Sequence, residues 1–361
     1  MIERLALVSL MACAACRAPS PLSKEPAFDF ESRSSPTEAS FSTESTLLSR
    51  WNDVRADSLR DFWNSGQAGS FKGVDGIEIA YRIHRAPNAK AGVVLLPGRT
   101  ESIVKFAEVC SDLVAQGYST YALTLRGQGE AGRMLPERDK GYVAWFDDYV
   151  EDTHTFISTV VRPEQARVFV LAHSMGGGVS VLVNDEHPGD VDALALSAPM
   201  LDINLGAFPP PVAASLASGI CDSTDGSGYA IGGGPYKEEQ DFEKNSVTSS
   251  EARWTWKVQQ LRDDEQIRAG GLTWRWLCQA LVGSSRAQQS GRFSSTPTVL
   301  FQAADDTFVN RPGQEKYCAD APRCTFSRIE NAKHELLQER DEVRNRVLSH
   351  VVRFFDSQVT P

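Results

Sequence analysis

One stretch constrains the fold of this chain more than any other: residues 168–183, VFVLAHSMGGGVSVLV. Its first five residues form a continuous apolar run, as a buried strand does, and its second half has the pattern of an apolar, glycine-rich helix. Between them, small residues at Ala172 and Gly176 flank Ser174. Such spacing lets a strand and a helix approach while a tight turn projects the serine hydroxyl off the edge of a sheet. The stretch therefore predicts a nucleophile at Ser174, although a helix start that merely packs on the sheet would share the pattern.

Short strand-like segments alternate with amphipathic segments along most of the chain. Ile103, Ala107, Cys110 and Val114 share one face of a helix that we expect to end at Gly117. The later strand-like runs are apolar throughout, as strands covered on both faces are. The alternation predicts an α/β fold with a mostly parallel sheet and helices on both faces, and no internal repeat is apparent. The expected strands are IEIAYRIH (77–84), VVLL (93–96), TYALTL (120–125), VFVLA (168–172), ALALSA (193–198), TVLFQA (298–303) and TFSRI (325–329).

The N-terminus has the composition of an export signal, which we place at residues 1–18. Its apolar run, LALVSLMACAAC, is too short to span a bilayer, although Glu3 weakens the positive charge before it. Leu10 to Cys13 resembles a bacterial lipoprotein box, which makes Cys13 a candidate for lipidation, with Cys16 as the alternative. We therefore expect an exported lipoprotein on the periplasmic face of a bacterial membrane. The alternatives are a secreted protein and the apolar start of a cytoplasmic enzyme.

Residues 19–50 are rich in Ser, Pro, Thr and Glu and carry isolated aromatics at Phe28, Phe30 and Phe41. Such a composition buries too little apolar surface to offset chain entropy, so we expect a disordered tether. Residues 51–200 and 291–361 then form the α/β core.

Residues 201–290 interrupt the strand and helix rhythm with a proline-rich turn, a Gly232–Gly234 run and tryptophans at 254, 256, 274 and 276. We expect this insertion to be a cap over the active-site end of the sheet, in which the tryptophans and the Phe208-Pro209-Pro210 turn could line an acyl chain. Core helices whose aromatics only fill space are the alternative.

Charge and cysteine spacing exclude some classes of partner. The net charge of −10, without a cluster of Lys and Arg, argues against a nucleic-acid partner. No CxxC pair or matching histidine spacing suggests zinc, so we expect no metal site. In an oxidising compartment Cys318 and Cys324, or Cys221 and Cys278, could form disulfides, and the odd count of five cysteines beyond the leader leaves at least one thiol.

A serine hydroxyl needs a base to take its proton and a third group to orient that base. His334 follows the last expected strand and precedes the terminal helix, which is where the chain order serine, acid, histidine places the base. Asp305 and Asp306 both end the strand TVLFQA, and the residues alone do not decide which is the acid. Backbone N–H groups of Met175 and Arg99 are the candidates for an oxyanion hole.

Several motifs together resemble one family. In chain order they are LPGRTESIVKFAE, LRGQGEAGRML, GYVAWFDDYVEDTHTFI, AHSMGG, SAPM, GYAIGGGP and IRAGGLTWRW. They are similar to bacterial lysophospholipases of the monoacylglycerol lipase-like, serine aminopeptidase S33-type branch of the α/β-hydrolases, from about Phe71 to Phe355.

The resemblance implies hydrolysis of a fatty-acyl ester, in a lysophospholipid or a monoacylglycerol, without a cofactor. It places the acid on Asp306, the nucleophile on Ser174 and the base on His334. Ala172 departs from the family's glycine, and Pro97 stands where many relatives carry histidine. An acyltransferase with the same triad and a non-catalytic lipid-binding lipoprotein remain alternatives. The head group, the acyl chain length and the oligomeric state stay open.

Overall fold

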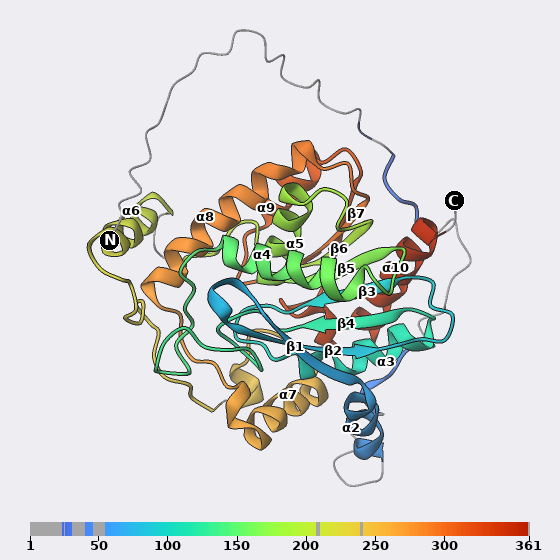
Figure 1. The fold of residues 1–361 in the computed structure, drawn as a ribbon. Helices are drawn as coiled ribbons and strands as arrows, with labels where there is room; N and C mark the ends of the chain where they lie inside the picture. The colour runs from blue at the N-terminus through green and yellow to red at the C-terminus, as the bar shows by residue number, and fades with distance from the viewer. Residues whose placement is uncertain are drawn as a thin grey trace.

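The computed structural model describes residues 24, 26–30, 40–45, 55–206, 210–238 and 241–359. An eight-stranded sheet runs through the centre in the order β1-β2-β4-β3-β5-β6-β7-β8 (Figure 1). β1 and β2 are antiparallel to their neighbours, whereas all pairs from β4 to β8 are parallel. The strands are β1 (Gln67–Lys72), β2 (Glu78–His84), β3 (Gly92–Leu96), β4 (Ser119–Leu123), β5 (Val168–His173), β6 (Ala193–Ser197), β7 (Thr298–Ala303) and β8 (Cys324–Ile329).

Helices cover both faces of the sheet, which confirms the predicted α/β class. Successive strand residues point to opposite faces, so Val94 and Leu96 join one buried cluster while Val93 and Leu95 join the other. The first cluster includes residues of α4, α5, α8 and α9, and the second includes residues of α2, α3, α7 and α10. The helices are α2 (Arg55–Ser65), α3 (Ala107–Ala115), α4 (Asp147–Phe156), α5 (Met175–Glu186), α6 (Pro210–Ser223), α7 (Glu251–Asp263), α8 (Trp274–Ser290), α9 (Arg311–Asp320) and α10 (Asp341–Val359).

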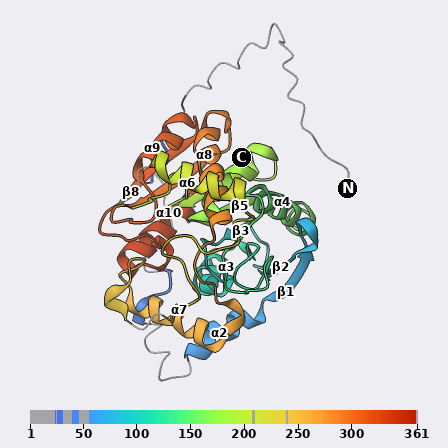
Figure 2. The same ribbon diagram turned by 90° about the vertical axis from the view of Figure 1, so that its left-hand side faces the viewer.

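The segment 201–290 lies across the side of the molecule that Figure 2 turns toward the viewer. Its parts differ in how they pack. α8 runs along α5 and α9 and contributes Trp276 and Ala280 to a core cluster. α7 contributes Ala252 and Trp256 to the other cluster. Trp256 and Trp276 are therefore part of the hydrophobic core.

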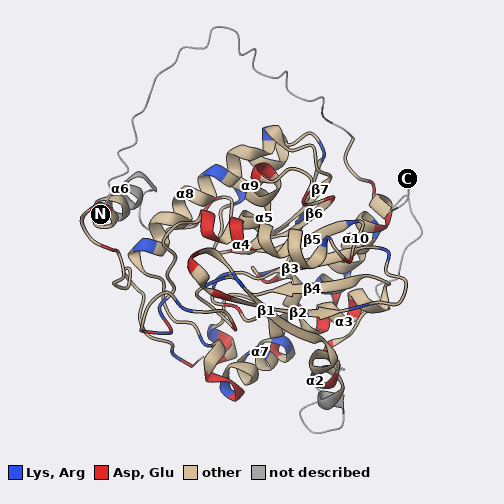
Figure 3. Ribbon diagram, viewed as in Figure 1, with Lys and Arg blue, Asp and Glu red and all other residues tan. Residues whose placement is uncertain are grey.

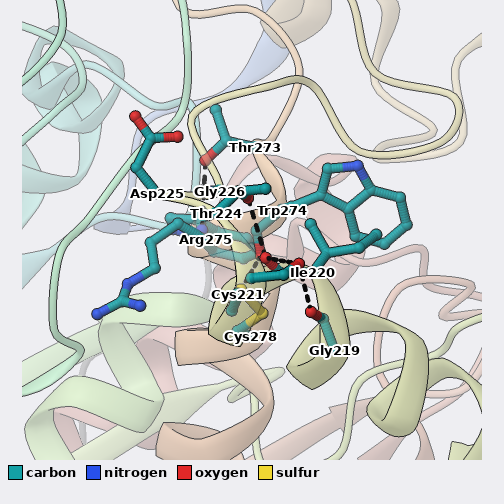
Figure 4. Close-up of a disulfide and its surroundings, with 12 residues drawn as sticks. Gly219, Ile220, Cys221, Thr224, Asp225, Gly226, Thr273, Trp274, Arg275 and Cys278 are labelled. Carbon is teal, nitrogen blue, oxygen red and sulfur yellow. Dashed lines mark hydrogen bonds between the residues drawn. A yellow bond between two sulfur atoms is a disulfide. The ribbon is translucent and has the colours of Figure 1, made fainter.

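Two disulfides are present, so both of the cysteine pairs considered from the sequence are formed. Cys221 of α6 is joined to Cys278 of α8, and Cys318 to Cys324 between α9 and β8. Figure 4 shows the first disulfide close to the turn after α6, where the Arg275 amide donates to the carbonyl of Gly226 at 2.9 Å. Within the described chain Cys110 is the free cysteine, and it is buried.

Pieces of the expected tether lie on the core. Phe28 stacks edge-on against Phe354 of α10, and Phe30 stacks on His350 with ring centroids 4.1 Å apart. Phe41 is only 5% exposed, and the amide of Ser42 donates to Asp112 at 3.0 Å. These described pieces therefore pack on the core through three phenylalanines, which provide apolar anchors that the average composition hides.

The export signal, Cys13 and Cys16 lie outside the described residues, as do Phe208 and Pro209. None of the helices that the structure describes combines the length and the apolar character needed to cross a bilayer. Acidic and basic residues alternate along the helices and loops of the described chain (Figure 3).

Candidate active site

The candidate nucleophile stands at the turn between β5 and α5. Ser174 has φ 50° and ψ −116°, a conformation that an L-residue adopts only when its surroundings hold it there. Its amide donates to Ser197 of β6 at 3.0 Å, and its carbonyl accepts from the amide of Met200 at 2.8 Å. The turn is therefore tied to the neighbouring strand on both sides of the serine.

The two small residues of the motif have different roles in this turn. A Cβ added at Gly176 would lie 2.6 Å from the carbonyl oxygen of Leu96, so only glycine allows α5 to approach β3 this closely. Ala172 lies within β5 and pairs with Leu96, where the alanine methyl is accommodated in a fully buried position. The departure from glycine at 172 thus leaves the geometry of the turn intact.

The structure brings together the three side chains that the sequence analysis singled out. Nε2 of His334 lies 2.9 Å from Oγ of Ser174, and Nδ1 of His334 lies 2.6 Å from Oδ2 of Asp306. Oδ1 of Asp306 accepts from the amides of Phe308 and Val309, which fixes the carboxylate. Asp305 is exposed, so Asp306 is the aspartate that faces the imidazole.

The loop after β3 contains the Arg99 amide, the candidate for an oxyanion donor. The Gly98 amide donates to Glu101 at 2.7 Å, and the Thr100 amide donates to Oε1 of Gln128 at 2.9 Å. Within the described chain the amides of Arg99 and Met175 donate to no other group. Two N–H groups at the nucleophile are what a tetrahedral oxyanion requires.

A buried charge cluster behind the site was not predicted from the sequence. Lys105 pairs with Glu101 in the loop that carries Arg99, and with Glu335, the residue after His334, at 3.1 Å. Burial is the largest single influence on Glu335 and acts to raise its pKa, but the charges of Lys105 and Lys257 and the hydrogen bond from Lys105 together hold this pKa below its usual range. Because Lys105 bridges two segments far apart in the chain, no local pattern could have revealed it.

His173 lies beside the catalytic candidates without contacting the serine hydroxyl. It is buried, and its ring centroid lies 4.7 Å from that of His334. Burial, and then the nearby His334 and Lys105, lower the pKa of His173 well below the usual range. His173 is therefore neutral, and Nδ1 lies 3.2 Å from the carbonyl oxygen of Ser197.

Ser174 and His334 line a cavity of about 930 Å³. This volume is in the range of sites for drug-sized or lipid-sized ligands. Of the four tryptophans in 201–290, Trp276 is the one that lines the cavity. Apolar and aromatic walls come from Met200, Ile203, Tyr236, Val247, Leu261, Ile267, Leu272, Trp276, Phe308 and Val309. Among the residues that the structure describes, no group of His, Cys, Asp and Glu side chains is arranged to hold a metal ion.

Comparisons with known proteins agree with this architecture. The family model described as "Serine aminopeptidase, S33" matches residues 87–341. Lysophospholipase L2 of Escherichia coli K12 is 34% identical over 313 residues, which cover 84% of this chain and 91% of that protein. A monoacylglycerol lipase of Mycolicibacterium smegmatis is 32% identical over 154 residues, covering 42% of this chain and 52% of that protein.

Among solved structures, a soluble variant of monoglyceride lipase from Saccharomyces cerevisiae shares the fold, with a TM-score of 0.65 and 18% identity. The match covers 82% of this chain and 96% of the yeast chain. The family model and the bacterial relatives confirm the resemblance drawn from the motifs. This chain belongs to the serine aminopeptidase S33 family of α/β-hydrolases, in the branch that contains lysophospholipases and monoacylglycerol lipases.

Proposed function

We propose that this carboxylic ester hydrolase removes the fatty-acyl chain from a lysophospholipid or a monoacylglycerol through an acyl-enzyme on Ser174. The observation that carries the proposal is the continuous chain of hydrogen bonds from Asp306 through His334 to Ser174, beside a cavity with apolar and aromatic walls. The lysophospholipase and monoacylglycerol lipase relatives support the lipid substrate.

In the proposed mechanism His334 takes the proton of Ser174 as the hydroxyl oxygen attacks the acyl carbon. Asp306 holds the imidazole by its Nδ1–H and stabilises the positive charge that forms. The amides of Arg99 and Met175 bind the oxyanion, and each such donor is worth about 3 kcal/mol in the transition state. His334 then gives its proton to the departing alcohol, and water repeats the cycle to release the fatty acid.

The test compares hydrolysis of a long-chain lysophosphatidylcholine, a monoacylglycerol and a short p-nitrophenyl ester by the wild type and by Ser174→Ala. We expect the long-chain lipids to be preferred and kcat to fall by about 10⁶-fold in the variant, as when other serine nucleophiles are removed. Ser180 is a buried serine of α5, the helix that follows Ser174, and Ser180→Ala is the matched control, which should retain activity and fluorophosphonate labelling.

Three outcomes would count against the proposal. Hydrolysis of the short ester alone would indicate a general esterase. Acyl transfer to an added alcohol faster than to water would indicate an acyltransferase. A folded wild type that neither cleaves these esters nor reacts with a fluorophosphonate would indicate a lipid-binding protein.

We also propose that the protein is exported and anchored through Cys13. The lipoprotein-like segment before Cys13 supports this location, and two disulfides are typical of an oxidising compartment. Labelling of cells with a fatty-acid analogue should mark the wild type and not Cys13→Ala. An unlabelled wild type would contradict the anchor. If the label were lost in Cys16→Ala but kept in Cys13→Ala, the lipidated residue would be Cys16.

A further inference from the structure

Arg99 places a charged group in the wall of the catalytic cavity. Its guanidinium carbon lies 5.4 Å from the ring centroid of Trp276, and both residues line the cavity. Nη1 is fully buried and has no hydrogen-bond acceptor, and Arg99 forms no ion pair with a carboxylate of the described residues. Burial lowers the pKa of Arg99, but a guanidinium stays protonated at neutral pH.

Several other charged residues of the same cavity are compensated within the protein, whereas Lys237 is exposed to solvent. Lys105 pairs with Glu101 and Glu335, Lys244 with Asp241, and Glu238 with Arg262. A buried charge without such a partner is costly and calls for an explanation, and a ligand bound in the cavity would supply the missing partner. For a guanidinium, the matching partner is a carboxylate or a phosphate, which it binds through two parallel hydrogen bonds.

The position of Arg99 relates this charge to the reaction. In the proposed mechanism its own amide binds the acyl oxygen, so its guanidinium lies one arginine side chain away from the reacting carbonyl. That reach is similar to the separation of acyl carbon and phosphorus in a lysophospholipid. We propose that the Arg99 guanidinium, supported by Trp276, binds the phosphate of a lysophospholipid head group while the Arg99 amide binds the acyl oxygen.

This inference rests on the proposed ester hydrolysis and narrows its substrate class. A monoacylglycerol offers only hydroxyl groups at the corresponding position, so it leaves the buried guanidinium without a counter-charge. The site therefore favours lysophospholipids over monoacylglycerols of the same chain length, and this preference resides in one side chain.

The first test measures kcat/KM of the wild type, Arg99→Gln and Arg99→Lys on a lysophosphatidylcholine and on the monoacylglycerol with the same acyl chain. The quantity of interest is the ratio of the two values, because any effect on the oxyanion amide is common to both substrates. We expect Arg99→Gln to lower the ratio about 10- to 100-fold, the usual effect of losing a hydrogen bond to a charged group. Arg99→Lys should retain part of the preference.

Arg311→Gln removes an exposed charge of α9 and is the control for net charge; its ratio should equal that of the wild type. A ratio unchanged in Arg99→Gln would overturn the proposal, even if both rates fell together. If the wild type hydrolysed neither lipid, the proposed ester hydrolase function itself would be wrong.

A second test does not depend on turnover or on an Arg99 variant. Ser174→Ala is titrated with a non-hydrolysable 1-O-alkyl lysophosphatidylcholine and with the matching 1-O-alkylglycerol, both below their aggregation concentrations. We expect the phosphate-bearing ether to bind about 10- to 100-fold more tightly. Equal affinities for the two ethers would overturn the phosphate site while leaving the ester hydrolase proposal standing.

Discussion

Ser174 illustrates how a single residue depends on its neighbours for a conformation that it would otherwise avoid. Its positive φ is held by backbone hydrogen bonds to β6 and to Met200, while the Gly176 amide donates to Pro97 at 3.1 Å. Strain of this kind costs on the order of 1–3 kcal/mol and persists only where the surrounding structure fixes it. Its benefit is a hydroxyl that points at Nε2 of His334.

At the same scale the two adjacent aspartates should differ sharply. Asp306→Asn should lower kcat about 10³- to 10⁴-fold, because an amide no longer holds the imidazole in the required tautomer. Asp305→Asn, an exposed neighbour, should leave kcat nearly unchanged. Steady-state kinetics on the preferred ester, with thermal denaturation to verify folding, measure both. Comparable losses in the two variants would disprove the assignment.

The sequence could predict the candidate triad but not its supporting groups. Ser174 and His334 followed from local motifs and chain order, whereas Asp305 and Asp306 were separated only by resemblance to a family. In the structure the choice depends on the turn after β7, which directs Asp306 to His334. The pairing of Lys105 with Glu335 was missed because only the tertiary fold brings these two segments together.

Elements with a continuous apolar pattern were predicted best. β3, β5 and β7 are buried along their entire length, so their sequences carry a clear signal. β1 was missed because Gln67–Lys72 is partly exposed on both faces and contains Gly69 and Ser70. The helix expected from Ile103 begins as a 3-10 turn, and α3 itself starts at Ala107. Strand order depends on pairing between distant segments and could not be predicted from the sequence.

The two disulfides should stabilise the protein unequally. Replacing both Cys221 and Cys278 by serine opens a loop with a sequence separation of 57, and the chain-entropy relation gives a loss of about 4 kcal/mol. The same replacement at Cys318 and Cys324, with a separation of 6, should cost about 2 kcal/mol. Urea unfolding of the two double variants measures the difference. A larger loss from the shorter loop would refute this entropic account.

At the scale of the whole molecule, the N-terminal pieces connect to the far end of the chain. Phe30 stacks on His350 of α10, and Phe301 of β7 lies on the same imidazole at 6.2 Å. Burial, followed by the charges of Arg353 and Arg346, lowers the pKa of His350 to about 4. The neutral imidazole is thus part of the contact that holds the N-terminal segment against the core.

This contact predicts a defined acid sensitivity. Because the pKa of His350 is lower in the folded than in the unfolded protein, its contribution to stability is complete above about pH 6.5 and is lost as the pH falls towards 4. The free energy of unfolding should therefore decrease over this interval, and the decrease should be smaller in His350→Gln. Urea unfolding of both proteins at about pH 7.5 and about pH 4.5 tests this. Parallel decreases would show that His350 is not the group responsible.

The order of the candidate catalytic residues along the chain determines when the site can assemble during synthesis. Ser174 follows β5, but its hydrogen-bond partner His334 is 160 residues further on and comes after every strand of the sheet. During synthesis, the serine leaves the ribosome long before its base does. A growing chain that has not reached residue 334 therefore lacks the proposed base, and its Ser174 hydroxyl has no imidazole to take the proton.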